Sequence, residues 1–145
     1  SPSMPIQAKF IVTKVRLLQA LWLLLAVFQA LILAGLIDYK YIAGGRLTSW
    51  EQAQEHLVMA ISVLIGFTLL LEKFYRSIVE KDWSKKWLRG VILVIGIYFI
   101  LNTVGNLLAV TLFEKVAFTP ITAISAIFCI QFASKSNKYE TSTEL

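Results

Sequence analysis

The stretch WLRGVILVIGIYFILNTVGNLLAVTLF, residues 87–113, decides the fold of this chain. As a helix it would extend roughly 40 Å, at about 1.5 Å per residue, which is enough to cross the hydrocarbon of a bilayer and both interfaces. Asn102 and Asn106 interrupt its apolar character one helical turn apart. Because an amide in hydrocarbon needs a hydrogen-bonding partner, the sequence predicts a membrane-spanning helix whose asparagine face turns toward a bundle interior.

The asparagine face also carries small residues. The residues within about 60° of Asn102 around the helix axis include Tyr98, Gly105, Asn106 and Ala109. Membrane helices associate by close backbone approach and by side-chain hydrogen bonds, each worth roughly 0.6–2 kcal/mol. We therefore expect Gly105 at a helix–helix contact and Ile97 on the lipid side. Two interpretations of the stripe stay open, a packing surface and a binding surface.

Composition extends this prediction to the whole chain. Hydrophobic residues make up 57% of the 145 residues, and the mean hydropathy is +0.70, whereas soluble domains are usually nearer about 45–50% apolar. The TSWE motif at residues 48–51 has the spacing of a capping box, and Thr119 before Pro120 is typical of a helix start.

The predicted fold class is therefore all-α, a polytopic membrane protein with an up-down bundle of four transmembrane helices. The bundle is expected to occupy residues 17–133, with helices at about 17–37, 49–73, 87–113 and 120–133. Residues 1–16 and 134–145 flank it. Ser1 to Ser3, ahead of Met4, are interpreted as an expression remnant and excluded from the fold.

The distribution of basic residues predicts the orientation. Of the 14 Lys and Arg residues, 11 lie before the first helix, in the segment 73–89 that forms the second connection and its rims, or after the fourth helix. The other two connections carry three. The positive-inside rule then places residues 1–16, the second connection and the tail 134–145 in the cytoplasm, so both termini are cytoplasmic.

This orientation predicts a polar cluster in the outer half of the bundle. Glu55 and Asn106 each lie about six or seven residues inside the outer end of their helix, roughly 10 Å deep. Thr122 and Gln29 come from the other two helices at comparable depth, whereas His56 should point away toward the interface. The predicted ligand-binding residues are Asn102, Asn106, Glu55, Thr122 and Tyr98. A simpler interpretation of Glu55 is a carboxylate at the membrane rim.

The second connection mixes basic and aromatic residues. They are Arg76, Lys81, Lys85, Lys86, Arg89, Trp83 and Trp87. This mixture suits anionic lipid headgroups at the cytoplasmic face, and a solvated loop is the alternative. The expected partners are thus the lipid bilayer and its anionic headgroups, together with a second copy or another membrane protein.

Several classes of site are argued against. Cys129 is the single cysteine, which excludes an intrachain disulfide, and His56 is the single histidine. We therefore predict no metal site and no cofactor. The net charge of +5 does not indicate a nucleic-acid partner, because the basic residues gather at the predicted membrane edges.

Short motifs in the second half of the chain resemble those of a known group. LNTVGNLLA at residues 101–109, FEK at 113–115 and FTP at 118–120 resemble a pattern in small bacterial four-helix integral membrane proteins, and the TSWE helix start is similar too. The resemblance implies a bacterial plasma (inner) membrane and a compact bundle. It implies no activity.

Two functions remain open. The first is a non-enzymatic binding, permeation or assembly module that uses the outer polar cluster. The second is a small membrane-embedded enzyme acting on a lipid or hydrophobic substrate. Catalysis needs a positioned acid–base pair, nucleophile or metal. The predicted spans contain no Asp pair, His cluster or Cys pair, which favours the first function, and no catalytic residue is predicted.

Overall fold

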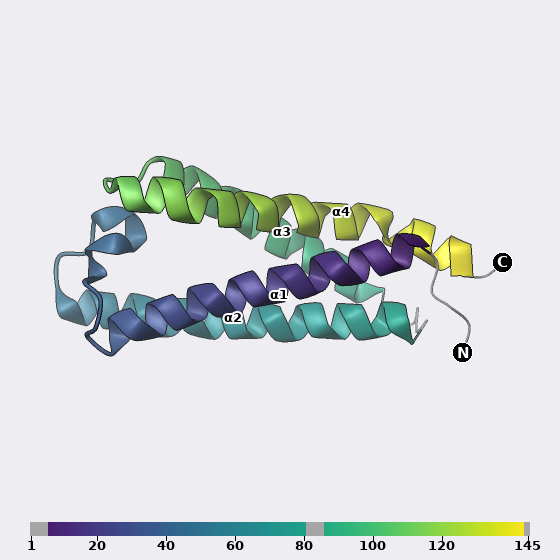
Figure 1. The fold of residues 1–145 in the computed structure, drawn as a ribbon, viewed down its shortest axis with the longest axis horizontal. Coiled ribbons are helices and arrows are strands. Elements are labelled where there is room, and N and C mark those ends of the chain that lie inside the picture. The colour runs from purple at the N-terminus through teal and green to yellow at the C-terminus, as the bar shows by residue number, and fades with distance from the viewer. Residues whose placement is uncertain (1–5, 81–85, 144–145) are drawn as a thin grey trace.

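Four long helices form the antiparallel bundle of this computed structural model, which describes residues 6–80 and 86–143 (Figure 1). They are α1 (Ile6–Leu33), α2 (Trp50–Val79), α3 (Trp87–Leu107) and α4 (Thr119–Thr143). Each contains a segment long and apolar enough to cross a membrane. No strand occurs in the described ranges. The prediction of an all-α bundle of four membrane-spanning helices is confirmed.

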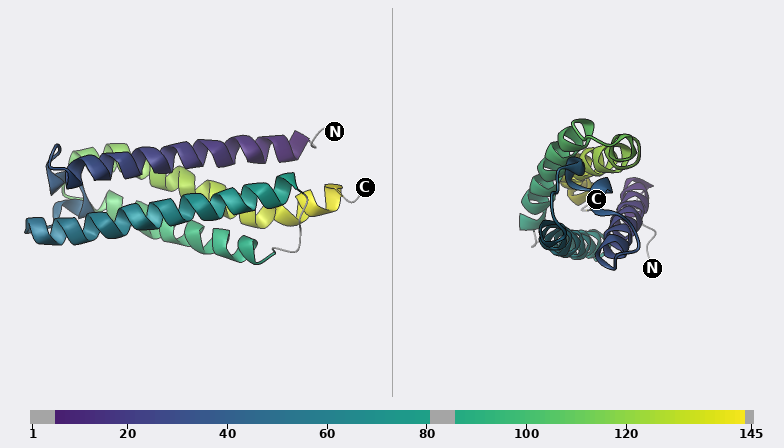
Figure 2. Two further views of the ribbon diagram at one scale, coloured as in Figure 1. Left: turned by 90° about the horizontal axis from the view of Figure 1, so that it is seen from below. Right: turned by 90° about the vertical axis from the view of Figure 1, so that its left-hand side faces the viewer.

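The two ends of the bundle differ. The start of α1, the end of α2, the start of α3 and the end of α4 lie together at what we call the terminal end (Figures 1 and 2). The opposite end, called the loop end, holds the connections from α1 to α2 and from α3 to α4. These connections contain the 3-10 helices η1 (Tyr39–Tyr41) and η2 (Ala43–Gly45) and the π-helix η4 (Glu114–Phe118).

The helix limits differ from the predicted ones. Hydropathy marks the membrane boundary and not the helix end, so α1 begins before residue 17, and α2 and α4 continue past residues 73 and 133. In contrast, α3 ends at Leu107 instead of residue 113. A new helical segment begins shortly afterwards, and the Thr111 hydroxyl caps it by accepting a hydrogen bond from the Glu114 amide (3.4 Å). The helix α3 therefore ends before Thr111. Residues 1–3 lie outside the described ranges.

Close helix packing occurs at a glycine other than the predicted one. A Cβ atom at Gly96 would lie 3.1 Å from Ile130 Cγ1 and 3.3 Å from Cys129 Cβ, so a hydrogen atom there lets α3 lie tightly against α4. A Cβ atom at Gly105 would meet no atom within 4 Å. The expectation of a helix contact at Gly105 is wrong, because Gly105 borders a cavity and does not lie against another helix. Ile97 is 49% exposed, on the outer side as expected.

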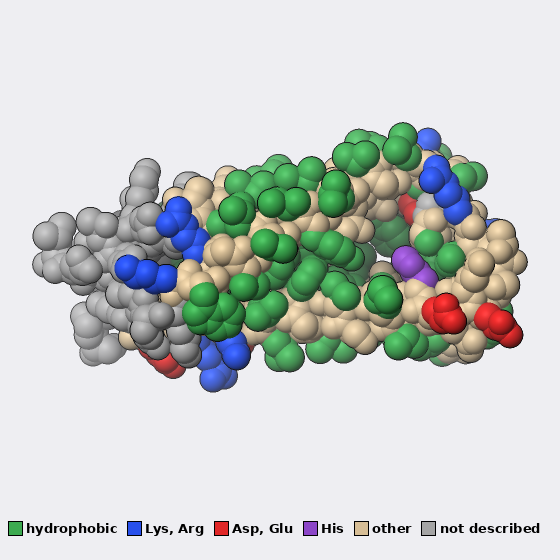
Figure 3. Space-filling model, turned by 180° about the vertical axis from the view of Figure 1, so that it is seen from behind, with side chains coloured by type: hydrophobic (Ala, Val, Ile, Leu, Met, Phe, Trp, Pro, Cys, Tyr) green, Lys and Arg blue, Asp and Glu red, His purple; other side chains and the backbone are tan. Residues whose placement is uncertain are grey.

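Side-chain hydrogen bonds join α1 to α2 and α4 toward the terminal end. Arg16 Nη1 and Gln19 Nε2 both donate to Glu72 Oε2 of α2, at 2.7 and 3.0 Å. Lys14 Nζ donates to Gln131 Oε1 of α4 at 3.1 Å. Figure 3 shows hydrophobic side chains over the middle of the molecule, with charged residues toward the two ends. This distribution is that of an integral membrane protein.

Candidate functional site

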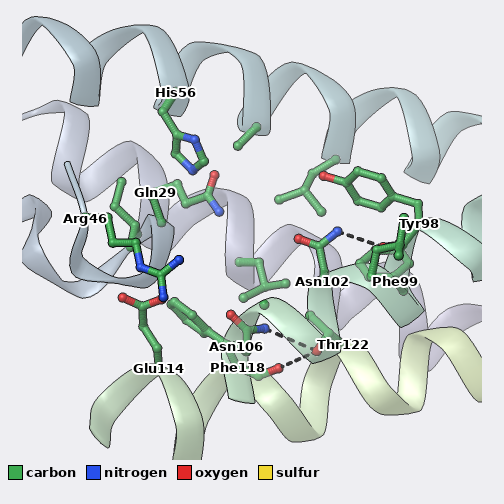
Figure 4. Close-up of a pocket in the computed structure, with 17 residues that line it drawn as sticks. Gln29, Arg46, His56, Tyr98, Phe99, Asn102, Asn106, Glu114, Phe118 and Thr122 are labelled. Atoms are coloured by element: carbon green, nitrogen blue, oxygen red, sulfur yellow. Dashed lines mark hydrogen bonds between the residues drawn. The ribbon is translucent and has the colours of Figure 1, made fainter. Parts of the chain in front are cut away.

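A cavity of about 450 Å³ lies near the loop end (Figure 4). Its volume is in the range of small-molecule sites, about 300–1,000 Å³. All four helices and the α1–α2 connection contribute to its wall. The polar lining residues are Gln29, Arg46, His56, Tyr98, Asn102, Asn106, Glu114 and Thr122.

The cavity opens sideways, between α2 and α3. The lining side chains that are exposed on these helices include His56 of α2 and Tyr98 and Leu101 of α3, the last two at 39% and 67%. By contrast, Leu25 of α1 and Thr122 of α4 are buried. Figure 3 shows the resulting hollow in the side of the molecule, with the single histidine at its rim and hydrophobic side chains around it.

The two asparagines are held differently. Asn102 Nδ2 donates to the Tyr98 carbonyl of its own helix at 2.9 Å, whereas Asn106 Nδ2 donates to Thr122 Oγ1 of α4 at 3.3 Å. Within the described residues, no hydrogen bond reaches either carboxamide oxygen. Both oxygens therefore remain as acceptors in the cavity wall (Figure 4).

Thr122 is the centre of a small hydrogen-bond network behind these amides. Its Oγ1 lies 3.0 Å from the Thr103 hydroxyl and 3.1 Å from the Phe118 carbonyl, to which it donates. Thr122 is buried and joins α4 to α3 through two side chains. It thus contributes to packing as well as to the cavity wall.

The far wall carries another acceptor. Gln29 Oε1 of α1 is buried and has no hydrogen-bond partner among the described residues. It faces a cavity large enough for a ligand or for water, either of which can supply the donor.

Charged groups gather where the cavity meets the loop end. Arg46 donates to the Leu108 carbonyl at 3.2 Å, and Glu114 lines the same end of the cavity (Figure 4). Glu114 is only 1% exposed and accepts a hydrogen bond from the Thr111 hydroxyl (3.3 Å). One basic and one acidic side chain therefore line this end of the wall, and their formal charges cancel.

An aromatic cluster packs beside the cavity on its terminal side, where Phe99 is one of the lining residues. The rings of Trp22 and Phe99 stack with centroids 5.3 Å apart, and Phe67 lies 6.1 and 5.9 Å from them. Trp22 Nε1 donates to the buried Ser125 hydroxyl at 2.9 Å. With Trp22 at 0% and Phe99 at 2% exposure, this layer is a packed floor.

The structure brings most of the predicted cluster together and changes one member. Asn102, Asn106, Thr122 and Tyr98 all line the cavity, as does Gln29. Glu55 is a correction, because its side chain is exposed and does not line the cavity. The neighbouring His56 lines it instead, contrary to the expectation that it points away.

The physical reason is the packing of α2. Its buried residues include Leu57, Leu64, Leu71 and Ile78, all at 7% exposure or less. This seven-residue spacing turns the leucine face inward and leaves Met59 and Ser62, which share the face of Glu55, exposed. The leucine spacing was the sequence signal for the inward face. Glu114 and Arg46 carried no such signal.

The residues predicted to meet anionic lipid lie at the terminal end. Arg76, Lys86, Trp87 and Arg89 are exposed there, and Arg76 Nε is 3.4 Å from Glu72 Oε1. Lys81, Trp83 and Lys85 lie outside the described residues. Among the residues described, no group of three His, Cys, Asp or Glu side chains could hold a metal ion.

Comparison of the chain with protein-family models, curated protein sequences and solved structures gave no match. The class of protein therefore follows from the fold and the cavity. The chain is a helical integral membrane protein with four apolar spans and, in its side, a cavity lined by both polar and apolar residues.

Proposed function

We propose that this protein is a non-enzymatic binding module that takes an amphipathic molecule from the membrane into the cavity between α2 and α3. The observation that carries the proposal is a wall of amide groups that opens on an apolar, lipid-facing side. A molecule with a polar head and an acyl chain can reach this mouth from the bilayer, with its chain beside Leu101 and its head beside Asn102.

The aromatic floor favours binding over permeation. A transported solute would have to pass the level of Trp22, Phe67 and Phe99, where the rings are packed together. A dead-ended cavity holds a ligand and returns it through the same mouth. Carboxamides hydrogen-bond without exchanging protons, and they are prominent in the wall, so the lining suits recognition better than the alternative of an enzyme acting on a lipid.

The orientation and membrane are part of this proposal. The excess of Lys and Arg at the terminal end supports cytoplasmic termini. The cavity then lies in the outer half of the membrane. The resemblance to small bacterial four-helix membrane proteins supports a bacterial plasma membrane. Exposed Arg76, Lys86, Trp87 and Arg89 would meet anionic headgroups at its cytoplasmic face.

Filling the cavity tests the binding function. The protein is purified from its membrane in mild detergent and examined by native mass spectrometry as wild type, Gly105→Leu and Gly90→Leu. Gly105 lines the cavity, and a Cβ atom meets no neighbour within 4 Å at either glycine. Gly90→Leu is therefore a matched control on the exposed surface of the same helix.

We expect a lipid-sized adduct on the wild type and on Gly90→Leu, and its loss from Gly105→Leu with the thermal midpoint retained. Equal adducts on all three proteins would contradict binding in this cavity. A dimer that is lost only in Gly105→Leu, with no small-molecule adduct, would show that a second copy occupies the mouth instead.

A further inference from the structure

We infer that the ligand is a lipid whose headgroup is uncharged and donates hydrogen bonds through hydroxyl groups, as glycerol and sugar heads do. This inference rests on the proposed binding function. It follows from the balance of donors and acceptors in the cavity wall and from its balance of charge.

Acceptors converge on the cavity from two helices. Gln29 Oε1 belongs to α1, and the Asn102 and Asn106 Oδ1 atoms belong to α3, one helical turn apart. The two asparagine amide nitrogens already donate to the Tyr98 carbonyl and to Thr122. Each of these bonds uses one N–H group, while the three amide oxygens accept no hydrogen bond from the described residues, so a ligand that satisfies these oxygens must supply donors.

The charge of the wall excludes an anionic head. A phosphate would lie against three amide oxygens and would share the cavity with the Glu114 carboxylate, and both kinds of group repel it. Glu114 is nearly fully buried and accepts from the Thr111 hydroxyl, so this acidic side chain is held in the wall and disfavours an anion beside it. An ammonium group would in turn meet the Arg46 guanidinium. Hydroxyl groups satisfy the acceptors and bring no uncompensated charge into the membrane.

The shape of the site fits a head of this kind. Three acceptors on opposite walls suit a head with several hydroxyl groups better than one with a single donor. The mouth between α2 and α3 is bordered by Leu101, which is 67% exposed, and by the Tyr98 ring. An acyl chain leaving the cavity there would enter the surrounding lipid at once.

Defined lipids test the headgroup. The full chain is placed in phosphatidylcholine nanodiscs with trace amounts of radiolabelled monoglucosyl-dioleoylglycerol, dioleoylglycerol or dioleoyl phosphatidic acid. A fourth probe is the glucosyl lipid with its sugar hydroxyls methylated. We expect the glucosyl lipid to bind best, dioleoylglycerol with its single hydroxyl to bind more weakly, and methylation to weaken binding of the glucosyl lipid at least tenfold. Phosphatidic acid should bind more weakly than either.

Two variants assign the contacts. Asn102→Ala and Gln29→Leu should each weaken binding of the glucosyl lipid about tenfold, since each removes an acceptor worth about 1.4 kcal/mol. Neither should change thermal stability, because Asn102 is bonded only within its helix and Gln29 Oε1 has no described partner. Ser62→Ala, on the exposed face of α2, is the control and should bind like the wild type.

The outcomes separate the two proposals. Preferred binding of phosphatidic acid, or equal binding of the methylated lipid, would overturn the headgroup inference. In either case, if Gly105→Leu abolished binding of the lipid that did bind, the proposed binding function would still be supported. If Gly105→Leu changed the binding of no probe, both proposals would be wrong. The amide oxygens would then accept hydrogen bonds from water.

Discussion

The polar residues of α3 and α4 line the cavity, join the two helices or do both, and their spacing along the sequence does not show which role a residue has. Asn102 and Thr122 both line the cavity, yet Asn102 bonds only within its own helix, whereas Thr122 connects two helices. An interhelical hydrogen bond contributes to stability in a membrane. An intrahelical bond at the edge of a cavity leaves the fold almost unchanged when it is removed.

We expect Thr122→Val to lower the stability of the protein by about 1 kcal/mol, because it removes the hydroxyl that Thr103 and Asn106 bond. Asn102→Ala should be close to neutral. Thermal unfolding in one detergent, followed by intrinsic tryptophan fluorescence, measures both. A larger loss of stability for Asn102→Ala than for Thr122→Val would mean that the two roles are reversed.

At the scale of the elements, the two glycines of α3 separate packing from binding. Gly96 lies against α4 and Gly105 borders the cavity. A leucine at Gly96 must displace Ile130 and Cys129, and such overpacking typically costs about 1–3 kcal/mol.

Gly96→Leu should therefore destabilise the bundle clearly, while Gly105→Leu and Gly90→Leu should not. The measurement is the thermal midpoint of the three purified variants side by side. Similar midpoints for Gly96→Leu and Gly90→Leu would refute the close approach of α3 and α4 at Gly96.

Polar contacts between α1 and α2 allow a second comparison of elements. Glu72 accepts from Arg16 and Gln19 of α1 and pairs with Arg76 of its own helix. The Arg76 side chain is 68% exposed, and exposed pairs contribute roughly 0–1 kcal/mol.

We expect Glu72→Ala to lower the unfolding temperature more than Arg76→Ala does, because the former removes the acceptor of the buried Gln19 amide. Glu72→Gln keeps an acceptor and should lie between them. If all three variants unfolded at the same temperature, the α1–α2 contact would be held by apolar packing alone.

For the whole molecule, the four antiparallel helices place the start of α1 and the end of α4 at the same end (Figure 1). Single cysteines in a Cys129→Ala background test the orientation. Lys40→Cys in the α1–α2 connection should react with an impermeant thiol reagent on intact cells, and Glu80→Cys at the end of α2 should react only after lysis. Both positions are exposed. The reverse pattern would place the cavity in the cytoplasmic half.

The sequence by itself determined the helical class, the four apolar spans and the bias of basic residues that predicts the orientation. It also indicated that Asn102, Asn106, Tyr98 and Thr122 lie near one another, because their helical spacing and depth are properties of single helices. Helical spacing and depth depend on helix geometry, and the apolar spans depend on the free energy of transfer from water to the membrane. Both can be calculated from the order of residues.

Only the tertiary structure decided which faces meet. It replaced Glu55 by His56, added Arg46 and Glu114, and moved the close contact from Gly105 to Gly96. The physical reason is that lipid and protein interior are similarly apolar, so hydrophobicity does not tell a membrane helix which side to bury. Side-chain packing and hydrogen bonds between helices make that choice, and they exist only once the four helices lie together.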